Sequence, residues 1–186
     1  LIAAKWESGM DNAVRFDETK IVQNNDKGWS MDRESVDLNA YLYAEKIHLS
    51  NLFLVLKDSI KAESYSEEAK TLQKKIQEVF YDENTGWFYD IDLENKEKLK
   101  VQGPEAWIPL WAKVATPEQA ERVRTTMLDT AKFATYIPFP TLSAAHPRFT
   151  PDRGYWRGPI WLDQVYFAIK GLRNYGYDEE ADRFTK

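Results

Sequence analysis

The sequence predicts an all-α protein built from stacked helical hairpins. Apolar residues recur every three or four positions over several stretches, and helix-capping patterns precede two of these stretches. No long glycine and serine linker, short repeat or low-complexity tract divides the chain, so we expect a single domain, or part of one, over 1–186. Paired helices of this kind build both toroids and solenoids, and the pattern alone does not separate the two.

Two long helices are expected in the first half of the chain. Residues 33–61 carry an apolar stripe at helical spacing, and the helix is expected to end near Ala62. Ser64 and Glu67 match a capping box, which predicts the start of a second helix with an inward face that extends to Phe80. The stripe of the first helix comprises Val36, Ala40, Tyr43, Ile47 and Leu54.

A short β-hairpin is expected next. Residues 82–86 are polar and end in glycine, which predicts a turn. Residues 87–91 and 99–101 have the composition of short strands and are separated by the polar stretch 94–97. We therefore expect these two segments to pair with each other between the helices.

Shorter helices and one long loop are expected in the second half. Residues 106–114 are expected to form a helix that Pro109 interrupts, and Thr116 with Gln119 predicts a cap for the helix that follows. Residues 129–158 contain four prolines and few helix formers, which predicts a long loop of the kind that is usually functional. A helix over 160–175 follows, and residues 178–186 are expected to begin another.

Composition excludes several classes of function. The net charge is −5 and no block of Lys or Arg stands out, which disfavours a nucleic-acid partner, and no stretch has the apolar length needed to cross a bilayer. The absence of cysteine excludes disulfides, thiolate metal sites and cysteine nucleophiles. His48 and His146 are too few for a histidine-based zinc site or a serine triad, so we expect no metal and no cofactor.

One acidic turn near the start carries the most chemical information. Residues 5–16 read KWESGMDNAVRF and place Asp11 in a glycine-containing turn between Trp6, Glu7 and Arg15. A carboxyl group in this setting can meet a sugar and hold a proton. The plain alternative is a surface turn in which the aspartate bonds only to backbone amides.

Taken with four further stretches, this turn resembles the signatures of glycoside hydrolase family 63, the bacterial inverting α-glucosidases, with the family 37 trehalases as more distant relatives. The further stretches are ESVDLNA at 34–40, GPEAW at 103–107, YWRGPIW at 155–161 and KGLRNYG at 170–176. The resemblance covers nearly the whole chain and implies an (α/α)6 barrel, of which this chain would be roughly half. Met10 and Ala106 depart from the related signatures, which affects the expected shape of the substrate pocket.

The resemblance implies hydrolysis of an α-glucosidic bond with inversion, with Asp11 as the general acid. In such enzymes a second carboxylate, roughly 6.5–9.5 Å away, activates the water. The resemblance places that base in a Glu-Asn-aromatic stretch far downstream, and none occurs before Lys186, so we expect it outside this chain. Apolar and anionic neighbours such as Trp6 and Glu7 would favour the protonated form of the acid.

Ten further residues are candidates for substrate binding. Aromatic rings stack on pyranose faces, and arginine can donate a pair of hydrogen bonds to hydroxyls. Asp37 and Glu105 are equally explained as acids near helix starts, stabilised by the helix dipole, and aromatic residues at a helix entry often only pack. The candidates are Trp6, Glu7, Asn12, Arg15, Asp37, Glu105, Trp107, Trp156, Arg157 and Trp161.

Two other functions stay open at this point, a non-catalytic sugar-binding module and a helical solenoid scaffold that binds protein. The chain lacks an initiator methionine and ends within a predicted helix, so we expect an internal piece that is inactive alone and has the rest of the same catalytic domain as its partner. The expected substrate is an oligosaccharide or disaccharide, and the expected location is the bacterial periplasm or cytoplasm. The sequence does not name the sugar or its linkage.

Overall fold

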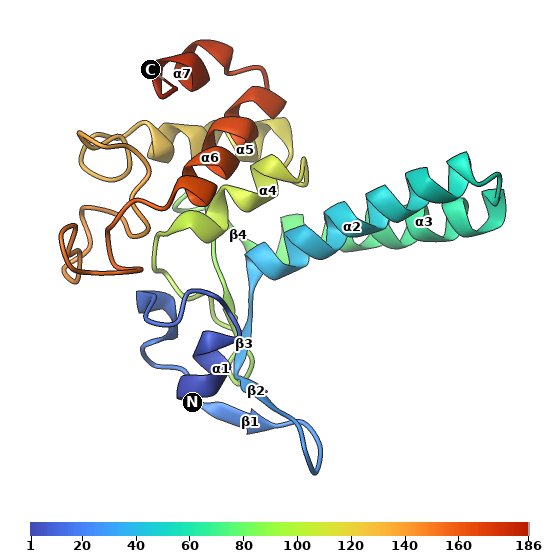
Figure 1. Ribbon diagram of the computed structural model, residues 1–186, viewed down its shortest axis with the longest axis horizontal. Coiled ribbons are helices and arrows are strands. Elements are labelled where there is room, and N and C mark those ends of the chain that lie inside the picture. Colours follow the sequence, from blue (N-terminus) through green and yellow to red (C-terminus); the bar gives the residue numbers. More distant parts are fainter. Residues whose placement is uncertain (186) are drawn as a thin grey trace.

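The computed structural model describes residues 1–185, which are mainly helical, with three small sheets of two short strands each (Figure 1). The N-terminal segment lies at one end of the molecule and the C-terminal helices lie at the other. A long helical hairpin projects from the middle (Figure 1). Lys186, the last residue of the predicted C-terminal helix, lies outside the described residues.

The projecting hairpin consists of α2 (Val36–Val55) and α3 (Ser59–Lys75), and a π-helix, η2 (Ile76–Phe80), continues α3. Its turn is tight because Lys57 adopts a left-handed conformation and the Asp58 side chain accepts a hydrogen bond from the Lys61 amide. The predicted start at Ser64 is therefore wrong: Asp58 caps α3 six residues earlier and shortens the connection. The two helices meet along Ser50 and the stacked rings of Phe53 and Tyr65.

The predicted hairpin of 87–91 with 99–101 is also wrong. Strand β5 (Trp87–Phe88) pairs with β4 (Tyr81–Asp82) across the predicted 82–86 turn, and β6 (Ile91–Asp92) pairs with β3 (Arg33–Glu34). Residues 99–101 form no strand, and a single bridge joins Ile91 to Lys98. Local composition identified extended residues here but not their partners, because strand pairing depends on which segments the fold brings together.

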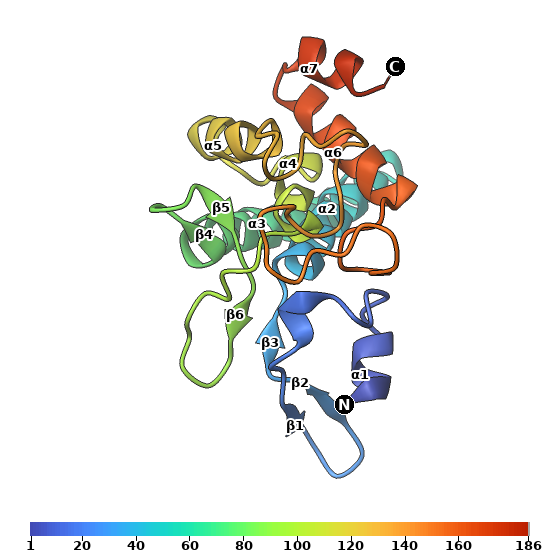
Figure 2. The same cartoon turned by 90° about the vertical axis from the view of Figure 1, so that its left-hand side faces the viewer.

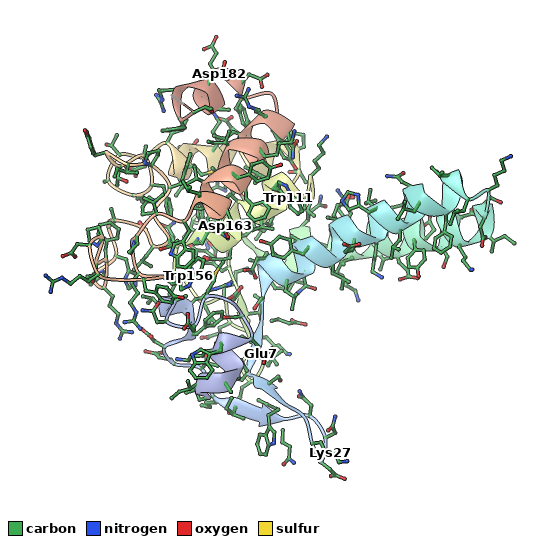
Figure 3. All side chains as sticks on the ribbon, in the orientation of Figure 1. Glu7, Lys27, Trp111, Trp156, Asp163 and Asp182 are labelled. Carbon is green, nitrogen blue, oxygen red and sulfur yellow. The ribbon has the colours of Figure 1, made fainter. Side chains whose placement is uncertain are left out.

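The N-terminal segment contains α1 (Ile2–Trp6), the 3-10 helix η1 (Val14–Phe16) and a hairpin of β1 (Ile21–Gln23) with β2 (Trp29–Met31). Lys27 lies at the tip of this hairpin (Figure 3). The alternation in these strands is too short to have predicted them.

In the second half, the 3-10 helix η3 (Pro104–Ala106) and α4 (Ile108–Trp111) replace the single predicted helix over 106–114, because a proline cannot lie deep inside a helix. Helix α5 (Pro117–Met127) has the predicted capping box of Thr116 with Gln119. Helices α6 (Leu162–Asn174) and α7 (Asp178–Arg183) end the described chain.

No helix or strand occurs in the long segment between α5 and α6, as predicted. It crosses in front of α4 and lies against the N-terminal segment (Figure 2). This contact brings residues near 12 together with residues near 155.

The main core is rich in aromatic rings and lies between the small sheets and helices α4, α5 and α6. Trp87 stacks on Phe133 with ring centroids 5.2 Å apart, and Trp107 meets the edges of both rings and of Phe139. Burial of such large rings removes much apolar surface from water and is the main stabilising contribution here. None of the helices in the described part of the chain is long and apolar enough to span a membrane.

Replacing the capping residue of α5 tests the local basis of this fold. We expect Thr116→Ala to lower the free energy of unfolding by about 1 kcal/mol, because the Gln119 amide loses its acceptor. Urea unfolding measures the change. The control is Thr125→Ala in the same helix, where the hydroxyl only donates to the Glu121 carbonyl, and equal losses in the two variants would contradict the capping role.

Candidate functional site

The acidic turn after α1 is held by its own short-range hydrogen bonds. The Ser8 hydroxyl donates to the Lys5 carbonyl at 2.5 Å and accepts from the Met10 amide at 3.1 Å. Gly9 has a positive φ of 72°, which lets the chain reverse without steric strain. The turn therefore presents Asp11 at a defined place in the chain.

Asp11 itself is half-buried, and among residues 1–185 no hydrogen bond or ion pair reaches its carboxylate. Its neighbours differ in this respect. The Asn12 amide donates to the Gly154 carbonyl, and Arg15 binds two carboxylates. Asp11 and Glu7 are thus the two acids of this turn that no side chain within the described structure neutralises.

Arg15 lies at the centre of a buried cluster of charges. Its Nη2 donates to Asp37 Oδ2 at 2.6 Å, and its Nη1 contacts Asp90 Oδ1 and Oδ2 at 3.2 and 3.0 Å. All three side chains are less than a tenth exposed. Asp90 Oδ1 also accepts from the Val36 amide at 2.9 Å, at the start of α2. One guanidinium therefore joins η1, the first turn of α2 and the segment before β6.

Glu105 lies beside this cluster in η3 and is also buried. Its Oε1 accepts from the Gly103 amide at 2.9 Å, and a Cβ at position 103 would lie 2.6 Å from Oε2, so a larger residue there would displace the carboxylate. Burial raises the pKa of Glu105 from its ordinary 4.5 to about 8, although Arg15 acts against the shift. Glu105 is therefore mostly protonated at neutral pH and adds little negative charge.

The other two pKa shifts in the cluster follow from burial and charge. Burial opposes the charge on Arg15, but the Asp37 and Asp90 carboxylates outweigh it and raise the pKa of the guanidinium. Burial raises the pKa of Asp90 in spite of the opposing effect of Arg15. The cluster therefore holds a permanent cation between two carboxylates.

A cavity of about 390 Å³ opens beside the cluster. Glu7, Arg15 and Asp37, three of the predicted binding residues, line it. Trp29, Arg33 and Tyr41 line it too, and none of these was among the predicted binding residues. Arg33 donates to Asp32 and Asp92, each at 2.7 Å, so both arginines of the cavity are already paired with carboxylates. An uncharged, hydroxyl-rich ligand suits such a lining.

Asn12 and Arg157 differ from the prediction that they hold sugar hydroxyls. The Asn12 Oδ1 accepts from the Trp156 amide at 2.9 Å, while Arg157 Nε donates to the Asn12 carbonyl at 2.8 Å. Arg157 Nη2 also contacts Asp17 Oδ1 at 2.5 Å. These bonds fasten the long loop to the acidic turn, because the backbone of both segments needs partners that no sheet or helix supplies.

Five of the predicted binding residues are buried, and three of them, Glu105, Trp107 and Trp156, do not line the cavity either, so the structure gives no support to their predicted contact with a sugar. Trp107 is fully enclosed in the aromatic core, so a sugar cannot reach its ring. Glu105 is closed off by the backbone of Gly103. Trp156 is 4% exposed, packs with Met10 and Phe16, and stacks on Trp161 with centroids 4.1 Å apart.

Trp6 and Trp161 remain candidates for stacking on a sugar. The Trp6 ring is 64% exposed at the end of α1. Trp161 is half-buried and donates from its Nε1 to the Tyr155 carbonyl at 3.0 Å, which fixes the ring. Trp6 is next to the acidic turn in the sequence, and Trp161 packs against the cluster that contains Met10 of that turn.

Asp90 is the member of the charge cluster that sequence reasoning missed. It lies in an extended stretch, YDIDL at 89–93, with nothing local to mark it, and its partner Arg15 is 75 residues away. Within the described part of the chain, no three His, Cys, Asp or Glu side chains are grouped so that they could hold a metal ion.

Comparison with known proteins places this geometry in context. The sequence profile of the mannosylglycerate hydrolase MGH1-like glycoside hydrolase domain matches residues 1–186. A mannosylglycerate hydrolase from Rubrobacter radiotolerans is 24% identical, over 97% of this chain and 52% of that protein. The chain thus spans about half the length of this curated relative.

Two solved structures have the same fold. The glycoside hydrolase family 63 mannosylglycerate hydrolase from Thermus thermophilus, in complex with glucose, superposes with a TM-score of 0.72 at 24% identity, over 82% of this chain and 36% of that one. The neutral trehalase of Saccharomyces cerevisiae also superposes with a TM-score of 0.72, at 22% identity, over 95% of this chain and 32% of the trehalase chain. The expected fold is confirmed: the chain is similar to (α/α)6 barrel enzymes, with small sheets added to its helices.

The protonated Glu105 generates a prediction about stability and pH. Because its pKa is higher in the folded than in the unfolded protein, the folded state holds the proton longer, and stability falls as pH rises from about 5 through 8. We expect Glu105→Gln to remove this part of the fall, which amounts to a few kcal/mol at about 1.4 kcal/mol per pKa unit. Urea unfolding at pH 5 and pH 9 measures it, with the exposed Glu179→Gln as control. Parallel pH profiles for wild type and Glu105→Gln would contradict the assignment.

Proposed function

We propose, from the membership of this chain in the mannosylglycerate hydrolase MGH1-like glycoside hydrolase domain family, that it forms part of an enzyme that inverts the anomeric carbon of the glycoside it cleaves. Asp11 is the general acid that protonates the leaving oxygen. The base that activates water is a glutamate outside residues 1–186. An acid on one face of the scissile bond and a base on the other is the arrangement that an inverting reaction requires.

The observation that carries this proposal is the contrast within the acidic turn. Asn12 and Arg15 bond to distant parts of the chain and Ser8 closes the turn locally, whereas the Asp11 carboxylate, like that of Glu7, has no partner among residues 1–185. A structural aspartate in a turn normally bonds to nearby amides. An untied carboxylate in a turn held on both sides supports a role toward a ligand.

The finer substrate assignment is an α-glucosidic bond in a disaccharide or oligosaccharide. Glu7 and Asp37 would accept hydrogen bonds from sugar hydroxyls in the 390 Å³ cavity. Trp6 and Trp161, which do not line that cavity, would offer ring faces to parts of the sugar outside it. The two paired arginines leave no unpaired cation in the cavity lining, which supports a neutral sugar there. The relatives act on different glycosides by their names, mannosylglycerate and trehalose.

The rest of the catalytic domain is proposed as the partner of this chain, and 1–186 as part of one (α/α)6 catalytic domain. The projecting hairpin exposes a series of large apolar side chains that a soluble surface rarely groups together. In an (α/α)6 barrel, neighbouring helices would cover them. The exposed side chains are Leu38, Leu42, Leu52, Leu54, Val55, Leu56 and Ile60.

Substitution of the proposed acid tests the function. We expect Asp11→Asn in the protein with its complete catalytic domain to lower kcat on an unactivated disaccharide by ~10²–10⁴, because the amide cannot protonate the leaving oxygen. The loss should shrink for an α-glucosyl fluoride, since fluoride needs little protonation. Asp26→Asn, in the exposed tip of the β1–β2 hairpin, is the control. Near wild-type turnover of the disaccharide by Asp11→Asn would refute the assignment.

A second prediction concerns residues 1–186 by themselves. We expect this chain to self-associate and to leave an α-glucosyl fluoride intact, because apolar helix faces are uncovered and the base is missing. Light scattering and fluoride release measure the two properties. A clean monomer would argue against the uncovered barrel faces, and turnover would place the base within residues 1–186.

A further inference from the structure

A buried acid with no contact to the cavity controls one of the groups that line it. Asp90 is 1% exposed and lies in the extended segment before β6. Both of its carboxylate oxygens face Arg15, and Oδ1 also accepts from the Val36 amide. Because Asp90 is enclosed and both of its carboxylate oxygens accept hydrogen bonds from the protein, it cannot contact a substrate directly.

These bonds converge on Asp37 along two routes. The Arg15 guanidinium bridges the two acids: its Nη1 contacts Asp90, and its Nη2 contacts Asp37 Oδ2 at 2.6 Å. Asp90 also accepts a hydrogen bond from the amide of Val36, the residue directly before Asp37 at the start of α2. Asp90 therefore holds Asp37 through its side-chain partner and through its backbone.

We infer that Asp90 is a positioning residue, which aims the Asp37 carboxylate into the cavity by fixing both Arg15 and the first turn of α2. This rests on the proposed function, in which Asp37 binds a sugar hydroxyl. Partners one step removed from a ligand-binding group commonly fix its orientation, and their loss typically lowers affinity or activity ~10–100-fold at metal sites. A buried ion pair contributes little net stability compared with apolar residues, so orientation is the more telling property to measure.

Charges from three elements face Asp90, and only Arg15 among them is positive. Asp37 approaches from α2 and Glu105 from η3, where burial keeps the latter mostly protonated. Neutralising Asp90 leaves Arg15 with a single carboxylate partner and one donor group without a fixed acceptor. The guanidinium can then turn and shift the acceptor Asp37 Oδ2, while the Leu38 amide, which donates to Asp37 Oδ1 at 2.9 Å, is left as the other contact of that carboxylate.

The test is Asp90→Asn in the protein with its complete catalytic domain. The asparagine oxygen still accepts from the Val36 amide, so the helix start is kept while the ionic contact to Arg15 is lost. We expect KM for the sugar substrate to rise about tenfold or more, with a smaller change in kcat, because ground-state binding to Asp37 is weakened. Asp82→Asn is the matched control: Asp82 is also buried and bonded, to Thr85 and Lys100, but it has no bond to Arg15 or to the start of α2.

A double-mutant cycle separates positioning from general destabilisation. If Asp90 acts through Asp37, Asp37→Asn with Asp90→Asn should have the KM of Asp37→Asn alone, whereas multiplied losses would overturn the inference. If Asp90→Asn does not fold, Arg15→Lys replaces it, because lysine keeps the charge but cannot bridge the two carboxylates. The same KM rise is then expected, and a wild-type KM would overturn the inference.

Different results would contradict the proposed function and the inference about Asp90. Unchanged turnover in Asp11→Asn would remove the function itself, together with the ground for this inference. A normal loss in Asp11→Asn and Asp37→Asn with wild-type KM in Asp90→Asn would remove only the inference. A KM rise in Asp82→Asn equal to that in Asp90→Asn would also remove it, since the effect would then be nonspecific.

Discussion

The arrangement of the site depends on one buried guanidinium. Arg15 joins the short helix after the acidic turn to the start of α2 and to the segment before β6. The β3–β6 pair already brings the last two segments together, and Arg15 adds η1 to them. Because the charge is enclosed, removal of one carboxylate would leave the guanidinium with a single ionic partner and a donor group without its acceptor, in a medium that solvates it poorly. This makes the geometry of the three segments interdependent. Asp37 consequently faces the cavity from a place that is fixed from two directions.

A second set of bonds holds the long loop, and its role differs. Asn12, Asp17 and Arg157 fasten the loop between α5 and α6 to the acidic turn, mostly through backbone groups. A segment of this length without regular structure must satisfy its amides and carbonyls in some other way. The stacked rings of Trp156 and Trp161 cover the same junction. Asn12, Trp156 and Arg157, which the sequence predicted to bind the ligand, thus hold the turn that contains Asp11 in place.

The aromatic residues divide between support and site by burial. Trp87 and Trp107 fill the core with Phe133, and their large rings are the reason that short strands and short helices cohere there. Trp6 is open to solvent and Trp161 is half-open. Residue type alone therefore does not distinguish a sugar platform from a packing element. Enclosure by neighbours decides between them.

The sequence by itself determined the helical class, a long helix within 33–61, the capping box at Thr116 and the position of the long loop, because each depends on residues within a few positions of one another. The bounds of that helix, Val36–Val55, came only from the structure. The sequence also identified the acidic turn with Asp11. Only the tertiary structure decided that β5 pairs with β4, that Arg15 selects Asp90 from 75 residues away, and that Trp107 is core. These outcomes depend on which distant segments the fold brings together. A strand pairs, and a buried charge is neutralised, only by groups that are close in three dimensions, whatever their distance in the sequence.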